Sequence, residues 1–505
     1  MATLRFKFAT LGVILCFASA CVSTKYLAPQ EMPLILLAGE VIITLDDNSV
    51  VRMSRPAVIK NKIVASTGKQ PRREIDLSRV RSVQIVHRDY FYPLLYVGVM
   101  GVAAFLAIGA STAPSPPPSQ CCPFIYAFDG RHWAFEAEPY GGAFCQALER
   151  VEWCRLDQIR EYRGVYRILV ANELEETQFT DELKLVIADH PRGLTVGFDP
   201  AGQIHTFANP LPPVRAYDVN GNDILPLLRA ADYEFWQSTP EIGGHSPDSE
   251  WRDEIVLEFP KPPDARTAKL LADVWTSVKG SLAARSFLEL YGKSLPDFYA
   301  EVNRLGPAYN QLIAWFLKEE LYLLKISVET KKGWKTKGVL YGGGPFIAKD
   351  KAYVIDVSDV AGDIVRLKLR PPKNFWLINS LAIDYSDDAP IQITELQPRA
   401  EGLSCRPDIQ ADLISDDNRY LVLEKKGDHV EIAFAAPPRP EQADRTIFVK
   451  ARGFYNIHLD ARGEPSWDIL AKLYDQPGFC VQYANERFQS EFSWAKGNYG
   501  QSKNR

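Results

Sequence analysis

Phe124-Ile-Tyr-Ala-Phe-Asp-Gly130, followed by Trp133-Ala-Phe-Glu136, predicts two short strands joined in a hairpin. Aromatic and β-branched residues favour strands, and Asp-Gly is a favoured turn pair between them. Similar short apolar runs, separated by turn residues, recur on both sides of this hairpin. The sequence therefore predicts a mainly β protein.

Two large β regions are expected on the C-terminal side. We predict a β-rich domain over 120–240, with strands at 166–170 and 183–187, and a β-sandwich over 250–494. A helical insertion is expected at 264–323, with helical patterns at 267–290 and 295–323, because apolar residues in the second stretch recur at three- and four-residue steps. Residues 495–505 are predicted to form a flexible tail.

A small unit and a hydrophobic segment are expected on the N-terminal side. Several short strands within 34–88 predict a small SH3-like, barrel-like β domain. Residues 90–111 contain no charged side chain and are mostly apolar or aromatic. A stretch of this length predicts one membrane helix. A buried core helix is the alternative. The Pro/Ser-rich stretch 112–119 is predicted to be a stiff linker.

The extreme N-terminus resembles a bacterial lipoprotein signal. Arg5 and Lys7 precede a short apolar run that ends in Ala18-Ser19-Ala20-Cys21. Residues 1–21 are therefore predicted to be a signal peptide, with Cys21 as the lipidated (palmitate-bearing) residue. An ordinary signal peptide or a degenerate anchor helix is the alternative. The predicted location is the bacterial cell envelope, with the main body of the protein periplasmic or extracellular. The sequence leaves open whether the anchor lies in the inner or the outer membrane.

The lipid and the hydrophobic segment conflict in topology. A lipid on Cys21 holds the small β domain outside, so a full crossing at 90–111 would bring the rest of the chain into the cytoplasm. Basic residues lie before the segment, which favours the opposite orientation. We expect a segment that dips into the membrane or packs against it, and its glycines leave a homo-oligomer open.

Charge and cysteine content narrow the class of protein. The net charge is −5, and no basic stripe indicates a nucleic-acid partner. Six cysteines remain once Cys16 and Cys21 are set aside, an even number that fits an oxidising compartment. Cys145 and Cys154 are the predicted local disulfide, and the other pairings are left open.

Motifs for catalysis are absent from the sequence. No Gly-x-Ser-x-Gly elbow, His-Glu-x-x-His helix or phosphate-binding loop is present, so we predict no catalytic residue, no metal site and no cofactor. His190 beside Asp189 could act as a base, but a hydrogen-bonded turn residue is the simpler interpretation. The best candidate site is an acidic cluster, which could bind Ca²⁺ or simply face water; its members are Glu173, Glu175, Glu176 and Asp181, with Glu182 beside them.

Several motifs together resemble a group of uncharacterised bacterial envelope lipoproteins. That group shares the order signal, small β unit, hydrophobic segment and Cys-Pro-led β region, and it implies the anchor and the architecture but no activity. The motifs here are Cys122-Pro-Phe-Ile-Tyr-Ala-Phe-Asp-Gly130, Glu138-Pro-Tyr-Gly-Gly142, Asn172-Glu-Leu-Glu-Glu-Thr177, Asp181-Glu-Leu-Lys-Leu-Val-Ile-Ala-Asp-His-Pro191 and Arg452-Gly-Phe-Tyr455.

A second likeness concerns the C-terminal half. Residues 353–360 and 375–384 resemble the paired strands of a galactose-binding-type β-sandwich, which implies sugar binding. We therefore expect a non-catalytic binding or assembly role at the lipid bilayer, with a glycan or another envelope protein as ligand. The alternative is an envelope hydrolase whose site is assembled from dispersed carboxylates.

Overall fold

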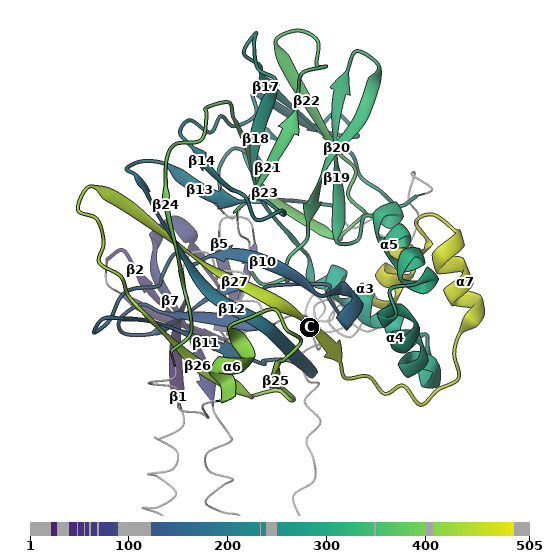
Figure 1. Cartoon of the computed structure of the whole chain (residues 1–505), viewed down its shortest axis with the longest axis horizontal. Helices are drawn as coiled ribbons and strands as arrows, with labels where there is room; N and C mark the ends of the chain where they lie inside the picture. Colours follow the sequence, from purple (N-terminus) through teal and green to yellow (C-terminus); the bar gives the residue numbers. More distant parts are fainter. Residues whose placement is uncertain are drawn as a thin grey trace, which may run out of the picture. The chain divides into compact units, whose positions relative to one another are not determined.

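The chain folds into two compact, mainly β units, Met1–Pro118 and Ser119–Arg505, as predicted for the fold class (Figure 1). The computed structural model describes residues 22–27, 40–88 except 48, 55, 60–61 and 68–69, and 123–488 except 233, 239–249, 348–349 and 400–407. The predicted signal peptide with Cys21, the hydrophobic segment 90–111, the linker 112–119 and the tail 495–505 lie outside the described residues. Among those described, no helix has both the length and the apolar character needed to cross a bilayer.

The first unit is built from two antiparallel sheets that share one core. The four-stranded sheet has the order β1 (Val22–Leu27), β7 (Val80–Arg88), β2 (Glu40–Leu45), β3 (Val50–Ser54). The three-stranded sheet has the order β4 (Pro56–Ile59), β5 (Lys62–Thr67), β6 (Gln70–Asp76). Ile43, Met53, Ile63 and Ile75 are buried together, so both sheets contribute to the core. The predicted start at residue 34 is too late, because β1 follows Cys21 directly and pairs with β7.

The second unit contains a first sandwich that begins with the predicted hairpin. Strands β8 (Phe124–Phe128) and β9 (Trp133–Ala137) pair antiparallel, which confirms that hairpin. They belong to a sheet with the order β26 (His429–Ala435), β11 (Val165–Ala171), β8, β9. The facing sheet has the order β10 (Arg150–Arg155), β27 (Ala443–Ile457), β12 (Glu176–Pro191), β24 (Gln392–Leu396), with β25 (Leu421–Leu423) also on β12. Buried residues of both sheets, joined by α6 (Asp408–Leu413), form one core.

A second sandwich lies between β14 and β24 in the chain. One sheet has the order β15 (Arg215–Asp218), β17 (Ile255–Pro260), β22 (Ile364–Leu369), β19 (Leu323–Thr330), β20 (Gly333–Tyr341). The other has the order β16 (Trp236–Gln237), β23 (Trp376–Asp384), β18 (Thr267–Thr276), β21 (Asp350–Asp356). The two segments that resemble a galactose-binding sandwich thus lie on either side of β18. A separate hairpin, β13 (Thr195–Phe198) with β14 (Ile204–Phe207), contacts β21.

The predicted boundary between 240 and 250 is wrong. The first sandwich takes β24 to β27 from the C-terminal part of the chain, and β12 pairs with β27 from Glu176↔Ile457 to Pro191↔Ala443. The second sandwich is therefore an insertion within the first. Local sequence patterns indicate where strands lie, but they do not reveal which strands pair across more than 250 residues, as β12 and β27 do.

The helical insertion is smaller than predicted. Residues 267–276 form the strand β18 instead of a helix, and β18 is central, between β21 and β23. A strand buried on both faces loses the polar alternation that distinguishes strands from helices. Within the predicted insertion the helices are α3 (Val278–Glu289), α4 (Leu295–Asn303) and α5 (Pro307–Glu319). Outside it, α7 (Trp467–Asp475) and residues 479–488 are also helical.

Candidate functional site

The predicted acidic cluster does not form one site. Glu173 and Glu175 are exposed, and Glu173 accepts a hydrogen bond from the Tyr126 hydroxyl at 3.1 Å. Glu176 is fully buried at the start of β12, and Asp181 lies five residues further along the same strand. Five residues of extended strand span roughly 16 Å, which is too far for shared ligands. Among the described residues, no three Asp, Glu, His or Cys side chains converge as metal ligands.

Asp181 belongs instead to an ion-pair cluster around Arg452. The register between β12 and β27 shifts between Thr180 and Glu182, so Asp181 is the extra residue of a β-bulge. Arg452 lies 3.4 Å from Asp181, 3.1 Å from Glu149 and 3.1 Å from Asp416. Burial and the neighbouring Asp416 raise the pKa of Asp181, while the Arg452 charge lowers it. This cluster joins three segments of the first sandwich.

The predicted disulfide between Cys145 and Cys154 is wrong. Cys145 is a free, buried thiol in the core of the second sandwich, and Cys154 contributes to the core of the first. Arg150 to Cys154 is extended strand, which carries Cys154 away from the loop that holds Cys145. Burial raises the pKa of the Cys145 thiol to about 12, so it is a poor nucleophile at neutral pH.

His190 is a structural residue, in line with the simpler interpretation. Its side chain is buried, and its two ring nitrogens lie 2.9 Å from the Thr446 hydroxyl and 3.0 Å from the Pro191 carbonyl oxygen. The neighbouring Asp189 is paired with Arg445. A catalytic base needs a free ring nitrogen, and both ring nitrogens of His190 already have a partner.

One pocket combines an aromatic wall with charged groups, and we call it the β10–β21 pocket. It has a volume of about 350 Å³ and is lined by residues of β10 in the first sandwich, of β13 and the turn after it, and of β20 and β21 in the second sandwich. Its described lining residues are Arg150, Val151, Glu152, Trp153, Phe198, Asp199, Pro200, Tyr341, Lys351 and Tyr353.

The aromatic wall is fixed by close packing. The rings of Trp153 and Phe198 stack with centroids 5.5 Å apart and planes 14° from parallel. Phe448 meets Phe198 edge-on at 4.9 Å. Gly202, with a φ of 82°, approaches Trp153 so closely that a Cβ atom there would lie 2.7 Å from the indole ring. The turn after Phe198 therefore needs glycine, and it holds the indole in place.

The charged wall is centred on Glu152. Its carboxylate accepts a hydrogen bond from the Lys351 ammonium at 2.6 Å and one from the Tyr140 amide at 2.7 Å. Arg150 lies 3.7 Å away. Burial raises the pKa of Glu152, but the charges of Lys351 and Arg150 outweigh this effect, so the pKa falls below its ordinary value. Glu152 is therefore ionised at neutral pH and pairs β10 with β21.

Strained backbone supports this wall from behind. Tyr140 is fully buried with a φ of 49°, a left-handed conformation that costs about 1–3 kcal/mol in a non-glycine residue. This conformation directs its amide to Glu152. Two of the motifs quoted for the lipoprotein resemblance, 138–142 and 452–455, meet here, because the Gly142 amide donates to the Tyr455 hydroxyl at 3.1 Å. The Tyr140 hydroxyl also lies 2.9 Å from the Thr180 hydroxyl.

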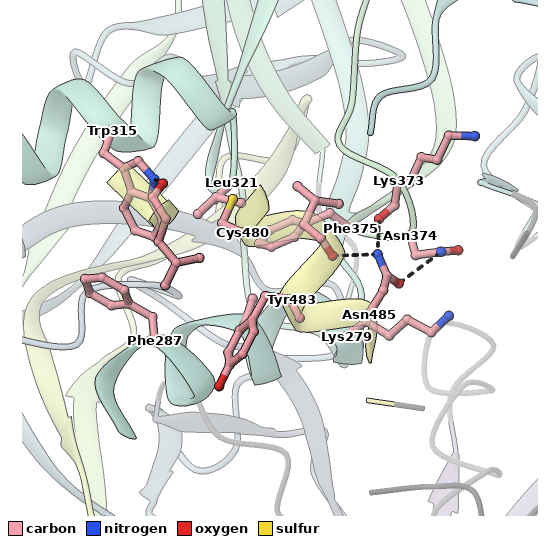
Figure 2. A pocket seen from close by; sticks show the side chains of 14 residues that line it. Lys279, Phe287, Trp315, Leu321, Lys373, Asn374, Phe375, Cys480, Tyr483 and Asn485 are labelled. Atoms are coloured by element: carbon pink, nitrogen blue, oxygen red, sulfur yellow. Dashed lines mark hydrogen bonds between the residues drawn. The ribbon is translucent and has the colours of Figure 1, made fainter. Parts of the chain in front are cut away.

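A second cavity lies among the helices, and it is small. Figure 2 shows Phe287, Trp315 and Phe375 around it, with Cys480 and Tyr483 on the final helical stretch. The cavity is about 20 Å³, room for about one water molecule. Asn485 fastens this stretch, because its side-chain amide accepts from the Asn374 side chain at 3.1 Å and donates to the Lys373 carbonyl at 3.5 Å. This region is core, and the β10–β21 pocket remains the candidate site.

The sequence contained little signal for the pocket. Trp153 was one of ten tryptophans with no feature to distinguish it, and Glu152 and Lys351 are 199 residues apart. Phe198-Asp-Pro-Ala-Gly202 has the composition of a turn, but its contact with Trp153 depends on the tertiary fold. A scan against protein-family models finds no match to this chain, and a comparison with curated protein sequences finds none either.

Proposed function

We propose that this chain is a lipid-anchored protein of the bacterial envelope with a non-catalytic binding role, and that the β10–β21 pocket takes a sugar ring of an envelope glycan. In this proposal Cys21 carries the lipid, residues 90–111 form the membrane-associated helix, and the first unit is the SH3-like domain. The observation that carries the binding role is the pairing of a fixed indole, Trp153, with charged side chains across one pocket.

The chemistry of the two walls supports a sugar. The C–H face of a pyranose packs on an aromatic ring, and its hydroxyls need charged or polar partners around the edge. Trp153 and Phe198 provide the aromatic surface. The charged partners for the hydroxyls are Arg150, Lys351 and Asp199. A volume of about 350 Å³ lies within the range of small-molecule sites, roughly 300–1,000 Å³.

Binding is favoured over hydrolysis by the state of the carboxylates. A glycosidase needs one protonated and one ionised carboxyl that both reach the substrate. Glu152 is ionised and engaged, and the other lining carboxyl, Asp199, accepts hydrogen bonds from the Ala201 and Gln203 amides. Glu138 and Glu176, two carboxyls with raised pKa, are buried and do not line the pocket. The described lining residues also include no serine, cysteine or histidine that could act as a nucleophile or base. The hydrolase alternative predicts turnover of the same oligosaccharides, which product analysis would detect.

Replacing Trp153 by alanine is expected to weaken saccharide binding by tenfold or more, since a buried tryptophan contact typically contributes about 2 kcal/mol or more. Calorimetric titration of the full chain with peptidoglycan-derived and other envelope oligosaccharides measures this. Trp334→Ala is the matched control, because Trp334 is 37 % exposed on β20 and does not line the pocket. Equal losses in both variants, or no binding of any saccharide by the parent chain, would contradict the proposal.

Replacing Cys21 by alanine is expected to abolish incorporation of labelled fatty acid and to move the protein out of the lipid-modified fraction. The mature parent chain should begin at Cys21 with an attached acyl mass, because the cysteine is the residue acylated after cleavage. Cys16→Ala is the control, since Cys16 lies within the predicted signal peptide. Mass spectrometry of the mature N-terminus measures both, and an unmodified chain starting at Met1 would refute the anchor.

A further inference from the structure

Residues 342–347, which we call the glycine loop, directly follow Tyr341 of the pocket and pack on the backbone at Gly141. They connect Tyr341 to the segment before Lys351, and both of these residues line the pocket. The backbone at Gly141 packs so closely on the loop that a Cβ atom there would lie 2.7 Å from the Gly343 carbonyl carbon. The loop is therefore held by direct backbone packing.

Glu138 fastens the glycine loop through its carboxyl group. The Phe346 amide donates to Glu138 Oε2 at 2.8 Å, and the Ile347 amide adds a second backbone hydrogen bond. The carboxyl group lies over Gly344, where a Cβ atom would come within 2.4 Å of it. Glu138 is only 4 % exposed, and its Oε1 atom has no hydrogen-bond partner in the described part of the chain.

Glu176 is a second buried carboxyl near Glu138. Its side chain is fully buried, and its Oε1 atom accepts a hydrogen bond from the side-chain amide of Gln178 at 2.8 Å. Its Oε2 atom has no hydrogen-bond partner among the described residues. Two carboxyl groups in one buried region thus each keep one oxygen without a partner.

The charged groups around this pair do not neutralise it. Those that act on Glu138 are acidic, Glu176 on β12 and Glu152 on β10. The nearby cations, Lys351 and Arg150, pair with Glu152. A buried carboxylate without a counter-ion is very unfavourable, so it takes up a proton or binds a cation. The described residues provide no set of three metal ligands, which favours the proton.

We propose that Glu138 and Glu176 are both protonated in the folded protein and that loss of these protons loosens the glycine loop and weakens binding in the β10–β21 pocket. Each glutamic acid releases its proton to solvent, and the resulting carboxylates repel each other and Glu152. The effect on the pocket rests on the proposed function. The protonation itself does not.

The direction of the pH dependence follows from burial. Burial raises the pKa of Glu176 to about 8, and burial together with Glu176 and Glu152 raises that of Glu138 well above its ordinary value. The folded state therefore holds protons that the unfolded chain releases near pH 4.5, the ordinary value for Glu. The contribution of these two groups to stability is therefore greatest below that pH and falls as the pH rises, and for Glu176 the fall levels off above about pH 8.

Infrared difference spectroscopy on the ligand-free chain tests the protonation directly. At about pH 7 the parent chain should show protonated-carboxyl absorption that persists above the ordinary range for Glu. Glu138→Gln and Glu176→Gln should each remove part of it, and the double variant should remove both parts. Glu173→Gln, a change at an exposed acid in the same segment, should leave it unchanged. No such absorption in the parent chain, or an equal absorption in the double variant, would overturn the proposal.

Saccharide affinity tests the link to the pocket. Between about pH 6 and pH 9.5 the parent chain and Glu173→Gln should lose affinity at least fivefold, within the usual range of coupling between sites. Glu138→Gln and Glu176→Gln should each reduce that loss, and the double variant should lose less than about twofold. If no saccharide binds at any pH, the proposed function fails. The infrared measurement still tests the protonation, because it uses the ligand-free chain. An unchanged pH dependence in the double variant would refute the link.

Discussion

Replacing Phe287 by alanine is expected to lower the free energy of unfolding by about 3–5 kcal/mol, the range for a fully buried phenylalanine. Phe287 lies on α3 and is 3 % exposed. Its ring stacks on Trp315 of α5 at 4.7 Å and meets Phe298 of α4 and Tyr474 of α7 edge-on at 5.7 and 6.0 Å. One side chain therefore contacts each of the other three labelled helices of this group.

The same ring also connects the helices with the loop between β9 and β10. Phe144, in the loop before β10, lies 6.4 Å from Phe287. We expect the loss in Phe287→Ala to appear in one cooperative transition of the second unit, followed by urea titration with near-UV and far-UV circular dichroism. Phe287→Leu should lose less, because it leaves a smaller cavity. A loss below about 1 kcal/mol, similar to that of an exposed residue such as Trp334, would contradict a central packing role.

Local chemistry was enough to predict the class of fold. The hairpin at 124–136 follows from aromatic strands around Asp129-Gly130, and the structure pairs Phe128 with Trp133. The same reasoning misassigned 267–276, because a central strand shows no alternation when both of its faces are buried. The period of apolar residues distinguishes a strand from a helix only where one face of the element is exposed to water.

The nested arrangement of the two sandwiches could not be predicted in this way. Strand β27 completes the first sandwich after the chain has formed the second, and nothing within 443–457 indicates that its partner is 176–191. The pocket depends on this arrangement, since Glu152 and Lys351 come from different sandwiches. The acidic cluster failed as a site for a related reason: five residues of one strand separate Glu176 from Asp181, although they are close in sequence.

Replacing Arg445 by methionine is expected to lower the free energy of unfolding by about 3–5 kcal/mol, because it leaves a buried carboxylate without its partner. Arg445 and Asp189 have exposed fractions of only 5 % and 6 %. The guanidinium forms two parallel hydrogen bonds to the Asp189 carboxylate, both of 2.7 Å, across the β12–β27 pair. It also donates to the carbonyl oxygens of Pro437 and Pro438 at 2.9 Å.

The double variant Asp189→Leu/Arg445→Met separates the two contributions to this loss. If the unpaired Asp189 carboxylate dominates, removing it should recover much of the stability, since an apolar pair of similar volume is often as stable as a buried ion pair. Arg445→Lys should be intermediate, because it keeps the charge but not the two-pronged geometry. Urea unfolding of the parent chain and the three variants measures these differences in the free energy of unfolding. A double variant as unstable as Arg445→Met would show that the bonds to Pro437 and Pro438, and not the ion pair, account for the role of Arg445.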